Sequence, residues 1–293
     1  MRRIALLVIT NLAIVLMLGL TTTLLGLNQF ITEQGLNLGA LLGFCAVLGF
    51  GGAFISLLIS KPMAKFSMRV RTIRGNEGAQ EAWLYQTVER LAQSAGIGMP
   101  EVGIYEGAPN AFATGARRDA ALVAVSTGLL SSMTHEQIEA VLAHEVGHIQ
   151  NGDMVTLTLV QGVMNTFVLA LARIIGYVVD RVVLKNENEG PGVGYLVTVV
   201  LMDILLGVLA AIVVASVSRK REFRADAQAA ALMGRPGPMV SALQALQRLH
   251  TGELAGNMKA LGIAGSKTSR WQKIGGLFAS HPPLEERIRA LQS

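Results

Sequence analysis

Four long apolar runs dominate the pattern of hydrophobic and polar positions along this chain. They occupy residues 4–27, 36–60, 155–179 and 193–218. A helix needs about 20 apolar residues to cross the hydrocarbon core of a bilayer, so each run is long enough to span it. The composition agrees, because 51% of the residues are hydrophobic and only 15% are charged. We therefore predict an α-rich integral membrane protein with about four transmembrane helices.

The runs form two hairpins that divide the chain into four segments. These are the first hairpin at residues 1–60, a polar segment at 61–154, the second hairpin at 155–218 and a polar segment at 219–293. Arg173 and Asp203 interrupt the second hairpin, and ionisable groups at membrane depth are costly unless they face protein or water. We expect these two side chains to pair, and the alternatives are that they lie in the active site or line a passage for substrate. The sequence leaves open whether the second hairpin crosses the bilayer completely.

Basic residues flank the runs unevenly and predict the orientation of the chain. They gather before the first run, after the second and after the fourth, at Arg2, Arg3, Lys61, Lys65, Arg69, Arg71, Arg74, Arg219, Lys220, Arg221 and Arg224. Because such residues mark cytoplasmic loops, we expect both polar segments in the cytoplasm, although Arg181 and Lys185 fall in the outer loop. The net charge of +5 lies mainly in these clusters. Anionic lipid is therefore the expected partner, and nucleic-acid binding is not required.

The first polar segment contains a clearly bounded helix pattern. Thr134 and Gln137 have the spacing of a capping box, which predicts a helix that begins near Thr134. Apolar residues follow at helical spacing, and Gly152 predicts the end. His144 and His148 fall inside this helix, four residues apart, so their side chains share one face.

Both histidines belong to an H-E-x-x-H motif, His144 to His148. On a helix this motif presents two imidazoles to one zinc ion and sets Glu145 beside the metal-bound water as the general base of peptide hydrolysis. A chance occurrence on a solvated helix is the alternative. The single cysteine, Cys45, lies in the second apolar run, which excludes an intrachain disulfide and argues against a zinc–thiolate site.

A catalytic zinc site usually has three protein ligands, and Glu222 is the best candidate for the third. It follows the fourth run by a few residues, and an antiparallel hairpin returns it to the depth of the H-E-x-x-H helix. Asp226 lies four residues further on, on the same helix face, where a carboxylate can orient a ligand imidazole. The alternative for Glu222 is a solvated acid that neutralises the neighbouring arginines.

Four motifs in this order resemble the membrane-embedded gluzincins related to CAAX prenyl proteases. They are Ala108 to Ala113, Leu142 to His148, Glu222 to Asp226 and Ser280 to Pro282, interleaved with the two hairpins. The resemblance implies a cytoplasmic zincin domain of the gluzincin-like α+β type. It also implies a zinc endopeptidase of the bacterial inner membrane that cleaves damaged or misassembled membrane proteins in quality control and the stress response. Its single zinc ion would be bound by His144, His148 and Glu222, with Glu145 as the base.

Two further sites gain a meaning from this resemblance. Asn110 to Thr114 is predicted to be part of a small sheet, whose edge in the family lines the cleft and pairs with the substrate backbone. Asn110, Ala111 and Phe112 are therefore candidate substrate-binding residues. An ordinary turn is the alternative reading. His281 either donates a hydrogen bond to the oxyanion during catalysis or caps a short helix at residues 284–291.

Two other functions remain in competition at this point. The protein could be a specialised processing protease for a lipidated or prenylated peptide, or a non-catalytic membrane scaffold that binds zinc structurally. A structural zinc site is closed by four protein ligands, whereas only three converge here. The Gly-rich stretch at residues 252–276 is either a flap over the cleft or a loose connection.

Overall fold

The computed structural model describes residues 30–32, 35–188, 190–260 and 279–293, together with Met17, Leu20 and Leu24, with side chains left out for residues 250–260. The predicted first span and most of the Gly-rich stretch lie outside these residues. The chain forms two compact units. The helical unit comprises Met1–Leu57 and Thr156–Val214, and the sheet unit comprises Leu58–Val155 and Ala215–Ser293.

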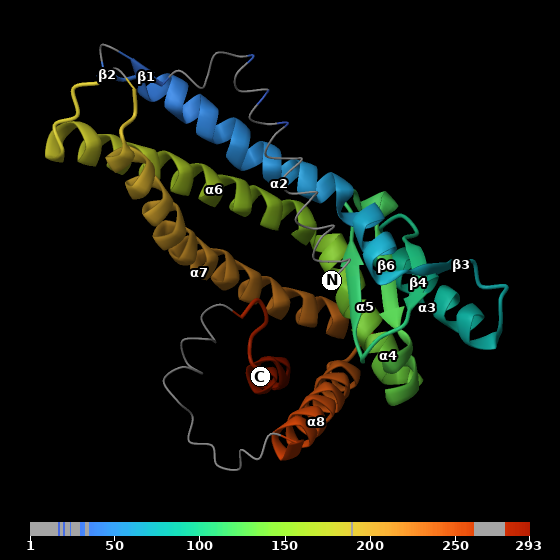
Figure 1. The fold of residues 1–293 in the computed structure, drawn as a ribbon. Coiled ribbons are helices and arrows are strands. Elements are labelled where there is room, and N and C mark those ends of the chain that lie inside the picture. The colour runs from blue at the N-terminus through green and yellow to red at the C-terminus, as the bar shows by residue number, and fades with distance from the viewer. Residues whose placement is uncertain are drawn as a thin grey trace. The chain divides into compact units, whose positions relative to one another are not determined.

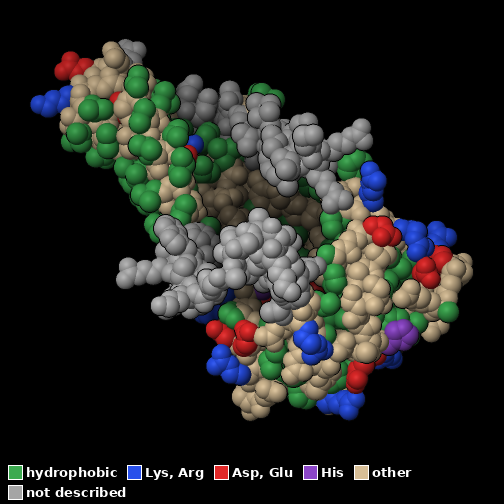
Figure 2. Space-filling view, turned by 60° about the horizontal axis from the view of Figure 1, so that its bottom comes forward, with side chains coloured by type: hydrophobic (Ala, Val, Ile, Leu, Met, Phe, Trp, Pro, Cys, Tyr) green, Lys and Arg blue, Asp and Glu red, His purple; other side chains and the backbone are tan. Residues whose placement is uncertain are grey.

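Three predicted spans are confirmed as long apolar helices (Figure 1). They are α2 (Leu38–Met68), α6 (Asp153–Val178), which continues as the π-helix η2 (Val179–Val183), and α7 (Val193–Leu232). Each is long and apolar enough to cross a membrane. Hydrophobic side chains cover the visible face of the helical unit, as expected for a surface that contacts lipid (Figure 2). The predicted fourth span continues without a break into the segment that carries Glu222.

Polar groups inside the helical unit find partners. Arg173 and Asp203 form the predicted ion pair, with Arg173 Nη1 3.7 Å from Asp203 Oδ1. Asp180, on the π-helix, is buried and accepts hydrogen bonds from the backbone N–H groups of Gly192 and Tyr195 at the start of α7. A buried carboxylate at the end of one helix therefore holds the start of the other helix of the second hairpin.

A four-stranded sheet forms the centre of the sheet unit, in the order β3-β4-β6-β5. Its strands are β3 (Arg71–Ile73), β4 (Glu101–Tyr105), β5 (Ala111–Thr114) and β6 (Leu122–Ser126). β4 and β6 are parallel, whereas β3 and β5 pair antiparallel to their neighbours. β5 therefore forms one edge of the sheet. This agrees with the sheet segment predicted at residues 110–114, except that the strand begins at Ala111. A separate two-stranded hairpin consists of β1 (Ile31–Thr32) and β2 (Gly35–Leu36).

Helices and loops bury both faces of this sheet. Val123 and Val125 of β6 belong to the main core with α3 (Ala79–Ala95) and α5 (His135–Asn151), whereas Leu122 and Ala124 pack in a smaller cluster on the other side. Burial on both faces explains why β6 is apolar at consecutive positions. The remaining elements of this unit are η1 (Arg118–Ala120), α4 (Thr127–Ser132), α8 (Gly237–Ala260) and α10 (Leu284–Gln292).

The ends of α5 agree with the sequence prediction. Thr134 and Gln137 form both bonds of the capping box, and Gly152 closes the helix in the left-handed conformation at φ 68°. Glycine adopts this conformation without steric cost, so the chain can turn sharply here. α6 begins at the next residue, Asp153.

Candidate metal centre

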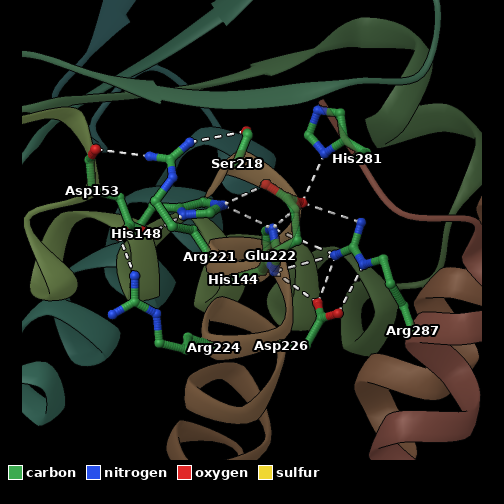
Figure 3. A network of polar contacts seen from close by, with 10 residues as sticks. All are labelled: His144, His148, Asp153, Ser218, Arg221, Glu222, Arg224, Asp226, His281 and Arg287. Carbon is green, nitrogen blue, oxygen red and sulfur yellow. Dashed lines mark hydrogen bonds and ion pairs between the residues drawn. The ribbon is translucent and has the colours of Figure 1, made fainter. Parts of the chain in front are cut away.

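The two histidines of α5 and Glu222 of α7 point toward one another in the sheet unit (Figure 3). His144 Nε2 and His148 Nε2 are 3.1 Å apart. The carboxylate of Glu222 lies 3.5 Å from His144 Nε2 through Oε2 and 3.4 Å from His148 Nε2 through Oε1. The structure thus brings together the three residues that the sequence singled out.

These distances fit a zinc ion. Ligand bonds of about 2.0–2.2 Å in a tetrahedral site separate neighbouring ligand atoms by about 3.3–3.5 Å, close to the three separations observed. Two imidazole nitrogens and a carboxylate oxygen are also the donor set that zinc binds in many catalytic sites. Among the described residues, this is the group of His, Cys, Asp and Glu side chains that could hold a metal ion.

Gly147 allows α7 to approach α5 this closely. A Cβ atom added at Gly147 would lie 3.2 Å from Gln228 Cβ and 3.3 Å from the carbonyl oxygen of Ala225. Both neighbours belong to α7. A larger residue between the two histidines would push α7 away and with it Glu222.

In each imidazole, the nitrogen that does not face Glu222, Nδ1, contacts a carboxylate. His144 Nδ1 lies 2.9 Å from Asp226 Oδ1, as predicted from the spacing of Glu222 and Asp226. His148 Nδ1 lies 2.6 Å from Asp153 Oδ2. Asp153 was missed in the sequence, where the segment was read only as the end of a helix, although an acidic residue five positions beyond His148 was a usable signal.

Arg287 of α10 adds a buried positive charge to this cluster. Its guanidinium donates two hydrogen bonds to Asp226, from Nε at 2.8 Å and from Nη2 at 2.6 Å, and Nη1 lies 3.4 Å from Glu222 Oε2. Burial lowers the pKa of Arg287, but the bond to Asp226 and the negative charges of Asp226, Glu222 and Glu145 together outweigh this and raise it. No sequence signal marked this residue, because its partners lie far away along the chain.

Burial and nearby carboxylates also act in opposite directions on the pKa of His148. Burial lowers the pKa of His148, but its contacts with Asp153 and Glu222 outweigh that effect and raise the pKa to about 9. The surroundings of His148 therefore favour positive charge at this position. A bound divalent cation would supply that charge in place of a proton.

A cleft of about 740 Å³ opens next to the three converging residues. Glu145 lines it and is partly buried. The edge strand contributes Asn110, Ala111 and Phe112, and the backbone of Asn110 is fixed by Ser126, whose hydroxyl accepts from Asn110 N at 2.9 Å. The predicted base and the predicted strand thus face the same cleft.

His281 also lines the cleft, and its Nδ1 lies 2.7 Å from Glu222 Oε2. The N-cap of α10 is Pro283, which makes no side-chain capping bond. The position of His281 therefore favours a role at the cleft over the capping role.

Some of the basic residues that flank the apolar runs make contacts inside the sheet unit. Arg221 is buried, and Lys61 and Lys65 both form ion pairs with Glu101, at 2.9 Å each. The sequence alone had assigned these residues to anionic lipid. Burial removes Arg221 from any lipid surface, because a side chain enclosed by protein cannot reach a headgroup.

Comparison with known proteins places the chain in a family. Residues 78–293 match Peptidase family M48. The chain belongs to this family. It is 60% identical to the Protease HtpX homolog of Paracidovorax citrulli and 61% identical to that of Verminephrobacter eiseniae. Each alignment extends over 295 residues and covers 100% of this chain and 99% of the relative. The resemblance to membrane-embedded gluzincins is thereby confirmed.

A solved structure supports the fold. The crystal structure of S. mikatae Ste24p matches with a TM-score of 0.60 at 21% identity, covering 86% of this chain and 58% of that chain. Together these findings make the chain a membrane metalloprotease, whose family implies a metal ion and protein substrates. The processing-protease and scaffold alternatives are not favoured.

Proposed function

We propose that this protein is a zinc endopeptidase that cleaves misfolded or damaged membrane proteins at the cytoplasmic face of the bacterial inner membrane. The observation that carries this proposal is the convergence of His144, His148 and Glu222 beside a cleft lined by the edge strand β5. Three protein ligands leave one position of a tetrahedral zinc site open, as catalysis requires.

Each side chain has a defined task in this proposal. His144, His148 and Glu222 bind one zinc ion, which when bound lowers the pKa of water and polarises the scissile carbonyl. The carboxylate of Glu145 takes a proton from the attacking water and later delivers it to the leaving amine. Asp226 keeps His144 in the orientation and tautomer that a ligand needs.

Two more groups act on the substrate. The outer edge of β5 at Ala111 and Phe112, with Asn110 just before it, pairs with the substrate backbone, which suits a protease that accepts many sequences. His281 donates a hydrogen bond to the carbonyl oxygen as this atom gains negative charge. Its position beside Glu222 in the cleft supports this task.

The covalent connection to the apolar helices supports a substrate near the membrane. Asp153, the partner of His148, is the first residue of α6, and Glu222 lies on α7. Both helices are candidate membrane spans. Together with the distribution of Lys and Arg, this favours cleavage of cytoplasmic segments of membrane proteins, with anionic lipid at the remaining exposed basic residues.

Glu145→Gln tests the proposed chemistry. The amide preserves the shape of the side chain but cannot take a proton, so proteolysis should fall by about 10²- to 10⁴-fold while zinc stays bound. Protein in detergent, stripped of metal and reloaded with zinc, is offered an unfolded soluble protein and a membrane protein side by side. Full zinc occupancy together with wild-type cleavage in this variant would refute the role of Glu145.

Cysteine labelling tests the orientation. Variants with one new cysteine at residues 75–130, 240–249 or 279–293 should be shielded from an impermeant reagent in intact cells, whereas cysteines at residues 186–188 should be labelled. The reason is that the Lys and Arg residues predict a cytoplasmic sheet unit. Labelling of the sheet unit from outside would reverse the orientation and the class of substrates.

A further inference from the structure

Asp153, which binds the imidazole nitrogen of His148 that faces away from Glu222, has few hydrogen bonds of its own. Asp153 is only 1% exposed, and its Oδ2 accepts a hydrogen bond from His148 Nδ1 at 2.6 Å. Its other oxygen, Oδ1, is buried without a hydrogen-bond partner among the described residues. Arg224 Nη2 lies 3.8 Å from this oxygen, on a side chain that is 62% exposed. Apart from its bond to His148, the carboxylate of Asp153 therefore has no hydrogen bond among the described residues that would hold it in place.

The backbone of Asp153 provides the missing restraint (Figure 3). Arg221 Nη1 donates to the carbonyl oxygen of Asp153 at 2.7 Å, and Arg221 Nη2 donates to Ser218 Oγ at 3.1 Å. Arg221 and Ser218 are both buried. The guanidinium of Arg221 thus binds the first residue of α6 and, on its own helix α7, the hydroxyl of Ser218 one turn earlier.

We propose that Asp153 is a positioning residue for the metal ligand His148, and that Arg221 acts through Asp153 by clamping its backbone to α7. The Arg221 clamp is the set of Asp153, Arg221 and Ser218. This inference rests on the proposed function, because it assumes that His148 binds zinc.

The chemistry follows from the two nitrogens of the imidazole. When the Nδ1–H group donates a hydrogen bond to Asp153, the proton stays on Nδ1 and Nε2 keeps a lone pair that faces His144 and Glu222. Without a fixed acceptor at Nδ1, the ring can rotate or place the proton on Nε2, and the proton must then be displaced before metal binds. Removing such outer partners typically costs 10- to 100-fold in metal affinity, as an order of magnitude.

The clamp ties this ligand to the second hairpin. Asp153 begins α6, and Ser218 and Arg221 lie on α7, both of which are candidate membrane spans. A change in the register of α6 against α7 at this point would move the acceptor of His148. The metal affinity of the protein therefore depends on how the first turn of α6 is joined to α7.

Asp153→Asn tests the first part of the proposal in the full-length protein in detergent. Zinc affinity is measured by competition with a chromogenic chelator, and thermal unfolding of the metal-free protein is recorded in parallel. The amide is nearly isosteric but can donate to Nδ1 and so favours the wrong tautomer. We expect zinc affinity to fall by about 10- to 100-fold with little change in the unfolding midpoint. Wild-type zinc affinity in this variant would overturn the proposal.

Arg221→Lys tests the clamp, with Arg224→Lys as its matched control. Lysine keeps the charge but cannot bind the Asp153 carbonyl and Ser218 Oγ with one fork. Arg224 is on the same helix and near the same carboxylate but exposed, so its variant should bind zinc as the wild type does. Equal affinities for the two lysine variants would overturn the role of Arg221.

The double variant Asp153→Asn/Arg221→Lys separates a route through Asp153 from an independent effect. If Arg221 acts through Asp153, the double variant binds zinc about as weakly as Asp153→Asn alone, because the two losses are not additive. Additive losses would refute the coupling. A wild-type protein that binds no zinc would instead refute the proposed function, so the two failures are distinguishable.

Discussion

Two Arg–Asp pairs, one in each unit, differ in geometry. In the sheet unit, Arg287 holds Asp226 with two hydrogen bonds of 2.8 and 2.6 Å, and the two side chains are 7% and 2% exposed. In the helical unit, Arg173 and Asp203 approach only to 3.7 Å, and their side chains are 16% and 34% exposed. The first pair is a buried bidentate contact, and the second is a loose ion pair.

Arg173 makes its closest polar contact with a backbone group of its own helix and not with the aspartate. Its Nη1 donates to the carbonyl oxygen of Leu169 at 3.0 Å, within the same helix, and its guanidinium lies 5.6 Å from the centre of the Phe44 ring. Asp203 Oδ1 has no hydrogen-bond partner among the described residues. The ion pair of Arg173 and Asp203 therefore partly neutralises the two charges but does not fix the orientation of either side chain.

Asp226, in contrast, has a second task. The same Oδ1 that accepts from Arg287 lies 2.9 Å from His144 Nδ1. An orienting carboxylate must itself be immobile, and the planar fork of Arg287 provides this. The difference teaches that an Arg–Asp pair shapes a site only where its geometry is bidentate and enclosed.

Arg287→Met should give the largest effect on stability. It leaves Asp226 buried without its cation, and breaking such a pair typically costs about 3–5 kcal/mol. The free energy of unfolding of the metal-free protein in detergent measures the loss. Arg289→Met, on the exposed side of α10, is the control and should change little. A loss of equal size in both variants would mean that α10 matters and the pair does not.

Asp226→Ala should lower zinc affinity by about 10- to 100-fold, because it removes an orienting partner and not a ligand. Glu222→Ala removes a ligand and should lower affinity much more. Metal titration of the two variants ranks them. Equal affinities, or weaker binding by the Asp226 variant, would show that the roles of the two carboxylates are exchanged.

Local patterns predicted much of the site. The capping box and Gly152 delimit α5, and the spacing of His144 and His148 follows from helical geometry. Glu222 could be inferred because a hairpin returns the chain to the same depth. Arg287 could not be inferred, because its contact with Asp226 joins residues 61 positions apart. In the sequence, nothing distinguishes this buried arginine of a short helix from a solvent-exposed one.

The fold shows the same limit. Apolar runs of sufficient length predicted α2, α6 and α7, because helices are local structures. The order of the sheet was not predictable, since β4 pairs in parallel with β6 although β5 lies between them in the sequence. Only that long-range pairing makes β5 an edge. A helix with Glu222 and Asp226 on one face was predicted, but the change from apolar to charged residues near position 218 hid that this helix is continuous with the fourth apolar run.

Asp203→Asn should destabilise the protein less than Arg287→Met, and it completes the comparison between the two pairs. The amide removes the charge but keeps the shape, and the long contact to Arg173 gives little to lose, since interhelical polar contacts in membranes average about 0.6 kcal/mol. The free energy of unfolding, measured in detergent micelles or bicelles, should therefore fall several-fold less than it does in Arg287→Met. The zinc affinity should not change. If Asp203→Asn destabilises the protein as much as Arg287→Met, bidentate geometry is not what separates the two pairs. Their difference would then have to come from the surrounding medium instead.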